Sequence, residues 1–205
     1  MTDAMIDVVP DAMIDAVTAR MVTPVKCLAL TALLASNAQA ANWAIDPQAS
    51  VLGFETTYEK LTVSGEFTRY DADIEFDAQD LNASGFDVRV HMEGAETGAD
   101  EGDRMLARSE WFDPNGYPQA RFVTERIEAD GDEGRYVAVG KLSIKQREHT
   151  LRFPFTWTVT EQGATVEGVA TVTRLDFDVG VGRWQDDERI GQQVQIVVRL
   201  NLLRQ

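Results

Sequence analysis

Apolar and polar side chains alternate with a period of two along most of the chain after residue 41, and this pattern constrains the fold more than any other feature. Successive side chains of a β-strand point to opposite faces, so each alternating segment predicts a strand with one apolar face. No segment of normal helical length interrupts the series. The predicted strands, bounded by Gly, Asp, Asn or Pro, cover residues 43–46, 50–58, 61–69, 72–77, 85–93, 119–129, 134–144, 150–160, 163–173 and 192–203.

The segment LRFPFTWTV, residues 151–159, shows the pattern most clearly. Its apolar side chains are expected on one face of a strand and its polar side chains on the other. Such one-sided strands are typical of antiparallel sheets, whose apolar faces turn to a common interior. That interior is either a packed core or the lining of a hollow one. The apolar face of this segment consists of Leu151, Phe153, Phe155, Trp157 and Val159.

About ten antiparallel segments without repeats or crossover helices leave a β-sandwich or a closed barrel. The number of aromatic side chains on the apolar faces favours an all-β, antiparallel barrel of about eight strands. A barrel of this size either fills with side chains or leaves room for one small ligand. One short helix fits within residues 96–112, where Asp100 or Asp103 can cap it. Its inward side chains are expected to be Met105, Leu106 and Trp111.

The N-terminus predicts export. An apolar run from Cys27 to Ala35 is followed by Ala38-Gln39-Ala40, which offers small residues where a signal peptidase cuts, so residues 21–40 are predicted to be a signal peptide. The run is far shorter than the ~20 residues that a membrane-spanning helix needs. Four Asp side chains precede Met21 and are the wrong charge for a signal. Residues 1–20 are therefore predicted to be a non-native upstream extension. An N-terminal amphipathic helix is the alternative interpretation of the apolar run.

Composition argues against several classes of function. The single cysteine lies in the predicted signal peptide, so residues 41–205 are expected to have no disulfide or thiol chemistry. These residues carry 17 basic and 30 acidic side chains, a net charge of −13, which is a poor match for nucleic acid or an anionic lipid surface. His91 and His149 have no second His or Cys at metal-ligand spacing, so no metal site is expected. The acidic clusters are interpreted as solvated turns rather than calcium loops.

Motifs of catalysis are also missing from the sequence. No Ser lies in a Gly-x-Ser-x-Gly elbow, and no Gly-rich loop opens a helix that could hold a phosphate. A pair of carboxylates for glycoside hydrolysis stays an alternative, because the sequence does not fix the distance between them. Binding is the more economical hypothesis, and we predict no enzymatic activity.

Five sequence blocks follow one another within residues 42–204: WAIDPQASVLGFETTY, VSGEFTRYDADIEFD, SEWFDPNGYPQARFVTERI, GKLSIKQREHTLRFPF and VTRLDFDVGVGRWQDDERIGQQVQIVVRL. In sequence and in order, these blocks resemble the YceI-like family. The family's members are secreted, lipocalin-like antiparallel barrels implicated in binding polyisoprenoids, among them the tails of isoprenoid quinones, and the resemblance implies a long apolar tunnel. The last block resembles members found with cytochrome b561-type quinol oxidoreductases. Met105 stands where many relatives carry a His, and Gln146-Arg147-Glu148 replaces a usual Gly.

Taken together, these observations predict that residues 41–205 form a periplasmic, non-enzymatic barrel that carries or sequesters a polyisoprenoid or isoprenoid quinone as its ligand, with no other cofactor. The alternative is an accessory protein of a membrane b-type cytochrome, with a solid core, no bound lipid and Trp184 as its surface contact. The sequence leaves open whether the protein forms a homodimer. Arg104 and Arg174 are predicted donors to the ligand's head group, with salt bridges as the alternative. The predicted ligand-binding residues are Leu52, Phe54, Phe67, Phe76, Val88, Val90, Arg104, Trp111, Phe122, Leu142, Phe153, Phe155, Trp157, Arg174 and Phe177.

Overall fold

The computed structural model describes residues 41–204 apart from residue 187, so the predicted signal peptide and upstream extension lie outside the described residues. The described part consists mostly of strands, with one α-helix, α1 (Asp100–Leu106). Its 3₁₀ turns are η1 (Leu81–Ala83), η2 (Met92–Gly94), η3 (Arg174–Phe177) and η4 (Gly182–Trp184). The strands are β1 (Ala41–Ile45), β2 (Val51–Tyr58), β3 (Leu61–Phe67), β4 (Tyr70–Phe76), β5 (Gly85–His91), β6 (Ala95–Glu96), β7 (Gln119–Ala129), β8 (Arg135–Ile144), β9 (Arg147–Val159), β10 (Gly163–Thr173) and β11 (Gln193–Arg204).

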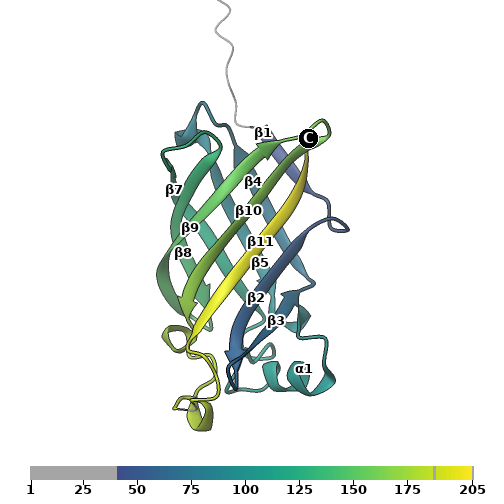
Figure 1. Cartoon of the computed structure of the whole chain (residues 1–205), viewed down its shortest axis with the longest axis vertical. Coiled ribbons are helices and arrows are strands. Elements are labelled where there is room, and N and C mark those ends of the chain that lie inside the picture. The colour runs from purple at the N-terminus through teal and green to yellow at the C-terminus, as the bar shows by residue number, and fades with distance from the viewer. Residues whose placement is uncertain (1–40, 187, 205) are drawn as a thin grey trace, which may run out of the picture. The chain divides into compact units, whose positions relative to one another are not determined.

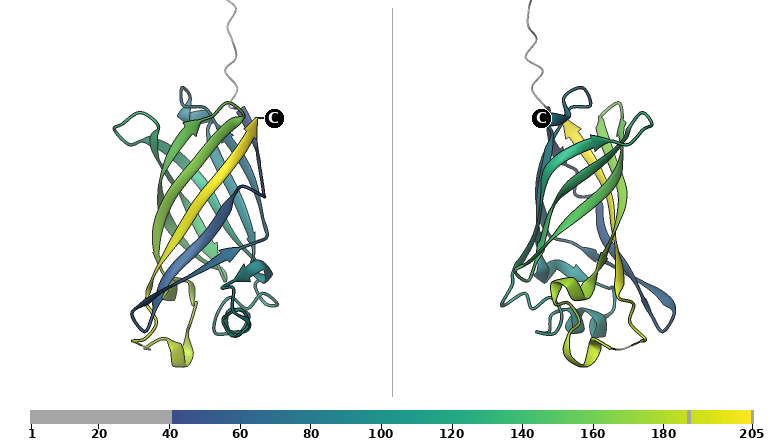
Figure 2. Two further views of the ribbon diagram at one scale, coloured as in Figure 1. Left: turned by 45° about the vertical axis from the view of Figure 1, so that its right-hand side comes forward. Right: turned by 90° about the vertical axis from the view of Figure 1, so that its left-hand side faces the viewer.

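Eight strands close into an antiparallel barrel, which confirms the predicted fold class (Figures 1 and 2). They follow one another around the barrel in the order β1-β4-β5-β7-β8-β9-β10-β11, and β11 returns to β1 through the pair Trp43↔Arg204. The other three strands extend this sheet: β2 pairs with β11 beside β1, β3 pairs with β2, and β6 pairs with β3. The end of the barrel at β1 and the C-terminal end of β11 lies opposite the end that carries α1 (Figure 1).

The predicted strands agree with the observed ones to within a few residues, and the short helix lies where it was predicted. The predicted cap is wrong. The N-cap of α1 is Ala99, which makes no side-chain bond to the helix. Asp103 instead accepts hydrogen bonds from the backbone N–H of Thr97 at 2.6 Å and from its hydroxyl at 2.7 Å. The acidic side chain therefore ties the loop before α1 to the helix rather than capping its first turn.

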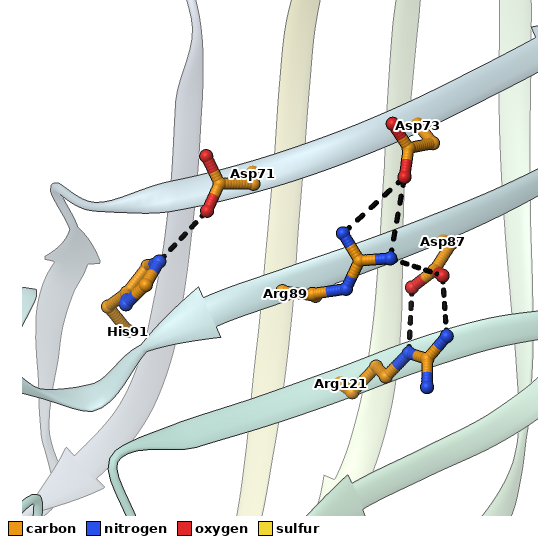
Figure 3. A network of polar contacts seen from close by, with 6 residues as sticks. All are labelled: Asp71, Asp73, Asp87, Arg89, His91 and Arg121. Atoms are coloured by element: carbon orange, nitrogen blue, oxygen red, sulfur yellow. Dashed lines mark hydrogen bonds and ion pairs between the residues drawn. The ribbon is translucent and has the colours of Figure 1, made fainter.

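Polar side chains cover the outer face of β4, β5 and β7 and form a network there (Figure 3). Oδ2 of Asp87 accepts hydrogen bonds from Arg89 at 2.7 Å and from Arg121 at 2.6 Å. Nε2 of His91 lies 2.9 Å from Oδ2 of Asp71. Because these polar groups face outward, the alternation along the same strands directs their apolar side chains into the barrel.

None of the helices in residues 41–204, leaving aside residue 187, has the length and the apolar character to cross a membrane.

Candidate functional site

An apolar cavity of about 190 Å³ lies inside the barrel. Nearly every side chain in its wall is a hydrocarbon or an aromatic ring, because the inward positions of β2, β4, β5, β7, β9, β10 and β11 are apolar. Two charged residues contribute to the wall, Arg121 and Arg174. The guanidinium of Arg121 reaches the outer network, where it binds Asp87 (Figure 3). Arg174 is therefore the one charged side chain of the wall that is buried.

Most of the predicted ligand-binding residues lie in this wall. The prediction rested on alternation alone, so the shared inward face of neighbouring strands explains the agreement. Contact with a ligand stays a prediction for all of them. The predicted residues that the structure brings together around the cavity are Leu52, Phe54, Phe67, Val88, Val90, Trp111, Phe122, Leu142, Phe153, Arg174 and Phe177.

Three predicted lining residues, Phe76, Phe155 and Trp157, lie outside the cavity wall. The Phe76 ring is stacked on Trp157 with centroids 4.2 Å apart and meets Phe155 edge-on at 5.9 Å. The indole N–H of Trp43 donates to the carbonyl of Phe76 at 3.3 Å, which joins β1 to the same group. We call the cluster that fills the β1 end of the barrel the aromatic plug; it consists of Trp43, Phe76, Phe86, Tyr136, Phe155 and Trp157.

The segment LRFPFTWTV therefore has both kinds of interior that its sequence left open. Leu151 and Phe153 line the cavity. Phe155 and Trp157, further along the same face of β9, belong to the aromatic plug, and Val159 beyond them is exposed. Because β9 runs the length of the barrel, side chains on its inward face border the cavity at one end of the strand and pack in the aromatic plug toward the other.

Arg174 cross-links the loops at the α1 end of the barrel. Its side chain is only 3% exposed, and its guanidinium donates to four backbone carbonyls. The acceptors are the carbonyls of Val179 at 3.0 Å, Gly180 at 2.6 Å, Trp184 at 2.8 Å and Gly191 at 3.1 Å. Most of the N–H groups that were predicted for a head group are therefore already occupied. The other predicted donor, Arg104, is exposed on α1 and lies outside the wall.

Lys145, which was not among the predicted site residues, also cross-links loops at the α1 end of the barrel. It lies in the two-residue turn between β8 and β9, where both Lys145 and Gln146 have positive φ, as two-residue hairpin turns often require. Its ammonium donates to the carbonyls of Ser109 at 2.9 Å, Trp111 at 2.7 Å and Asp178 at 3.0 Å. Burial lowers the pKa of Lys145, and nearby carboxylates, among them Asp178, partly oppose that shift. The lysine thus uses all three of its N–H donors on loop carbonyls.

Trp111 occupies the wall between these two cations. The ring is 6% exposed and lies 6.0 Å from the ring of Trp184, edge to face. The guanidinium carbon of Arg174 lies 5.9 Å from the Trp111 centroid, within cation–π range. Trp184 packs on Trp111 and is partly exposed, and its contact with a partner, as in the accessory-protein alternative, stays a prediction.

The alanines of the wall were missed because their small side chains give a weak apolar signal. Ala120 and Ala170 are 5% and 2% exposed, and both lie on the inward face of their strands. Ala120 pairs with Val90, so its place could have been deduced from register. In residues 41–204 other than 187, no group of three or more His, Cys, Asp or Glu side chains is arranged to hold a metal ion.

Proteins of two other bacteria are similar to this chain in sequence. A UPF0312 protein of Photorhabdus laumondii is 30% identical over 115 residues, which span 55% of this chain and 59% of that protein. A UPF0312 protein of Pectobacterium atrosepticum is 25% identical over 193 residues, 87% of this chain and 96% of that protein.

Among solved structures, Burkholderia cenocepacia BcnA superposes with a TM-score of 0.73 at 27% identity, covering 77% of this chain and 98% of BcnA. A polyisoprenoid binding domain from Saccharophagus degradans, implicated in plant cell wall breakdown, superposes with a TM-score of 0.65. It is 13% identical over 81% of this chain and 99% of that domain, which shows a shared fold. The YceI-like domain model matches residues 43–202, and the chain belongs to the YceI-like family.

Proposed function

We propose that this barrel binds a polyisoprenoid lipid, with the prenyl chain lying in the apolar cavity. The observation that carries the proposal is the cavity itself, which lies inside the barrel and is walled mainly by hydrocarbon side chains. The Saccharophagus degradans domain of the same fold, described as polyisoprenoid binding, supports it. Burial of a prenyl chain contributes roughly 25 cal/mol for each Å² removed from water, against which the ordering of the chain must be set. Burial of this kind needs no catalytic residue.

The ligand is, in this proposal, an isoprenoid quinone or another prenyl lipid that the protein carries or sequesters in the periplasm. The predicted signal peptide supports the location. A prenyl lipid is nearly insoluble in an aqueous compartment, so a hollow apolar barrel gives it a place outside the membrane. The chain end of the ligand is expected next to the aromatic plug, because the plug fills the barrel at that end.

Two neighbouring positions on β10 provide a test. Ala170 faces the cavity and is 2% exposed, whereas Val169 faces outward and is 45% exposed. Ala170→Phe places a ring inside the cavity, and Val169→Phe places the same ring on the outer surface. Each variant is freed of lipid, loaded with a prenyl benzoquinone and passed through a gel-filtration column, and the retained quinone is counted.

Wild type and Val169→Phe are expected to retain about one quinone per chain, and Ala170→Phe to retain at least ten times less. Circular dichroism confirms that both variants are folded. If folded Ala170→Phe retains as much quinone as wild type, the ligand does not lie in the cavity and the proposal fails.

A further inference from the structure

Two buried indole N–H donors at the α1 end of the barrel, one on a residue of the cavity wall and one on a residue packed against it, have no acceptor among the described residues. The indole Nε1 atoms of Trp111 and Trp184 are buried, and neither has an acceptor among the described residues 41–204, from which 187 is excepted. Trp111 is only 6% exposed and forms part of the cavity wall. A buried indole N–H normally finds a partner, because leaving it without one forfeits its hydrogen bond to water. We call Trp111 and Trp184 the indole pair.

The cations beside the indole pair are committed to the protein's own backbone. Arg174 donates to four carbonyls and Lys145 to three. An anionic head group would have to displace these bonds to recruit either cation. A neutral acceptor has no such need, since the indole N–H groups are neutral donors. The indole N–H groups are therefore available to a neutral acceptor, whereas the two cations are already bonded to backbone carbonyls.

We propose that the indole pair is the head-group site of this barrel and that it takes a neutral oxygen acceptor, such as the carbonyl of a quinone, in preference to a phosphate. This inference rests on the proposed binding of a prenyl chain in the cavity. Trp111, in the wall, is the primary donor, and Trp184, packed against it, is the second. The chain extends from this site toward the aromatic plug at the other end.

The backbone around Trp111 is held from two sides, which fixes its ring before a ligand arrives. The Trp111 carbonyl accepts from Lys145 at 2.7 Å. The preceding carbonyl, of Glu110, accepts from the N–H groups of Gly180 at 2.6 Å and Val181 at 3.0 Å. Gly180 has φ of +70°, and a side chain there would press on both Arg174 and the Trp111 ring. A donor held in this way loses little conformational freedom when it binds an acceptor.

The test compares three ligands of equal chain length: a prenyl benzoquinone, the prenyl hydrocarbon without a head group, and the prenyl pyrophosphate. Dissociation constants are measured for the wild-type protein and for Trp111→Phe, which keeps an aromatic ring but removes the N–H group. Trp157→Phe, in the aromatic plug, is the matched control. The infrared carbonyl stretch of the bound quinone reports the hydrogen bond itself, which a merely structural role of Trp111 would not move.

Wild type and Trp157→Phe are expected to bind the quinone at least fivefold more tightly than the hydrocarbon and more tightly than the pyrophosphate. In Trp111→Phe the preference for the quinone over the hydrocarbon falls about fivefold, hydrocarbon affinity stays within twofold, and the carbonyl stretch moves to higher frequency. The inference is overturned if Trp111→Phe keeps the preference and the frequency, or if the pyrophosphate binds wild type as tightly as the quinone does. Continued binding of the hydrocarbon would then leave the proposed function standing, whereas loss of all three ligands from wild type would overturn both.

Discussion

The aromatic plug predicts a large and specific loss of stability when Phe76 is truncated. Phe76 is 2% exposed, and its ring contacts those of Trp157 at 4.2 Å, Tyr136 at 5.0 Å, Phe155 at 5.9 Å and Phe86 at 6.4 Å. Phe→Ala changes in well-packed cores cost about 3–5 kcal/mol, because the neighbours only partly fill the space. Rings on several sides of Phe76 restrict that relaxation, so we expect about 4 kcal/mol for Phe76→Ala.

Phe67 is the matched comparison, because its ring lies in the cavity wall. It contacts Phe54 at 5.3 Å and Phe112 at 5.8 Å, it borders the cavity, and it is only partly buried. A side chain that already borders empty space makes fewer contacts, so fewer are lost on truncation. We expect about 2 kcal/mol for Phe67→Ala.

The assay is urea unfolding of lipid-free protein, followed by circular dichroism. Lipid must be removed first, because a ligand that binds only the folded state adds to the measured stability. For a domain of this size, a loss of about 4 kcal/mol corresponds to a melting temperature lower by roughly 10 °C. Equal losses for the two variants, or a loss below about 2 kcal/mol for Phe76→Ala, would show that this end of the barrel is not packed as described.

Three further predictions concern the loops and the outer network. Gly180→Ala should weaken quinone binding at least threefold, because its Cβ would press on Trp111 and Arg174 at a residue with φ of +70°; titration by fluorescence quenching measures this, and unchanged affinity would contradict it. Lys145→Met should cost about 2 kcal/mol in urea unfolding at pH 7 by leaving three carbonyls without a donor. The pKa of Lys145 lies below 10.5, so the unfolded state holds the proton to higher pH and wild type gains stability as pH rises toward 10.5; Lys145→Met should lack this gain. Hydrogen bonding from Arg121 lowers the pKa of Asp87, so the stability that Asp87 contributes is present above pH 3.8 and is lost as pH falls through the lowered pKa; Asp87→Asn should be about 1 kcal/mol less stable at pH 7 and lose less on acidification, and parallel pH profiles would refute this.

Alternation was sufficient to predict the strands but not how they close. Each strand carries its own local signal, since the period of two is set by backbone geometry. Closure depends on the pairing of β1 with β11, through Trp43↔Arg204, Ala44↔Leu203 and Ile45↔Leu202. These residues are far apart in the sequence, and no local pattern marks them as partners. The two-residue strand β6 was missed for a related reason, because two residues cannot show an alternation.

The sequence predicted which side chains point into the barrel, but not whether each one lines the cavity or belongs to the aromatic plug. Phe153 and Phe155 share the inward face of β9, yet the first lines the cavity and the second fills the plug. The distinction depends on which rings the other strands supply at each level. Arg174 shows the same limit for a charge, because its carbonyl partners come from loops whose course the sequence does not specify.

The proposed function requires that the cavity hold a prenyl chain in the living cell. The direct measurement is mass spectrometry of an organic extract from the exported protein, purified without detergent from its native host. If the proposed function holds, the extract contains one prenyl lipid for each chain, with a neutral oxygen-bearing head group. A folded protein that yields no prenyl lipid under these conditions would contradict it.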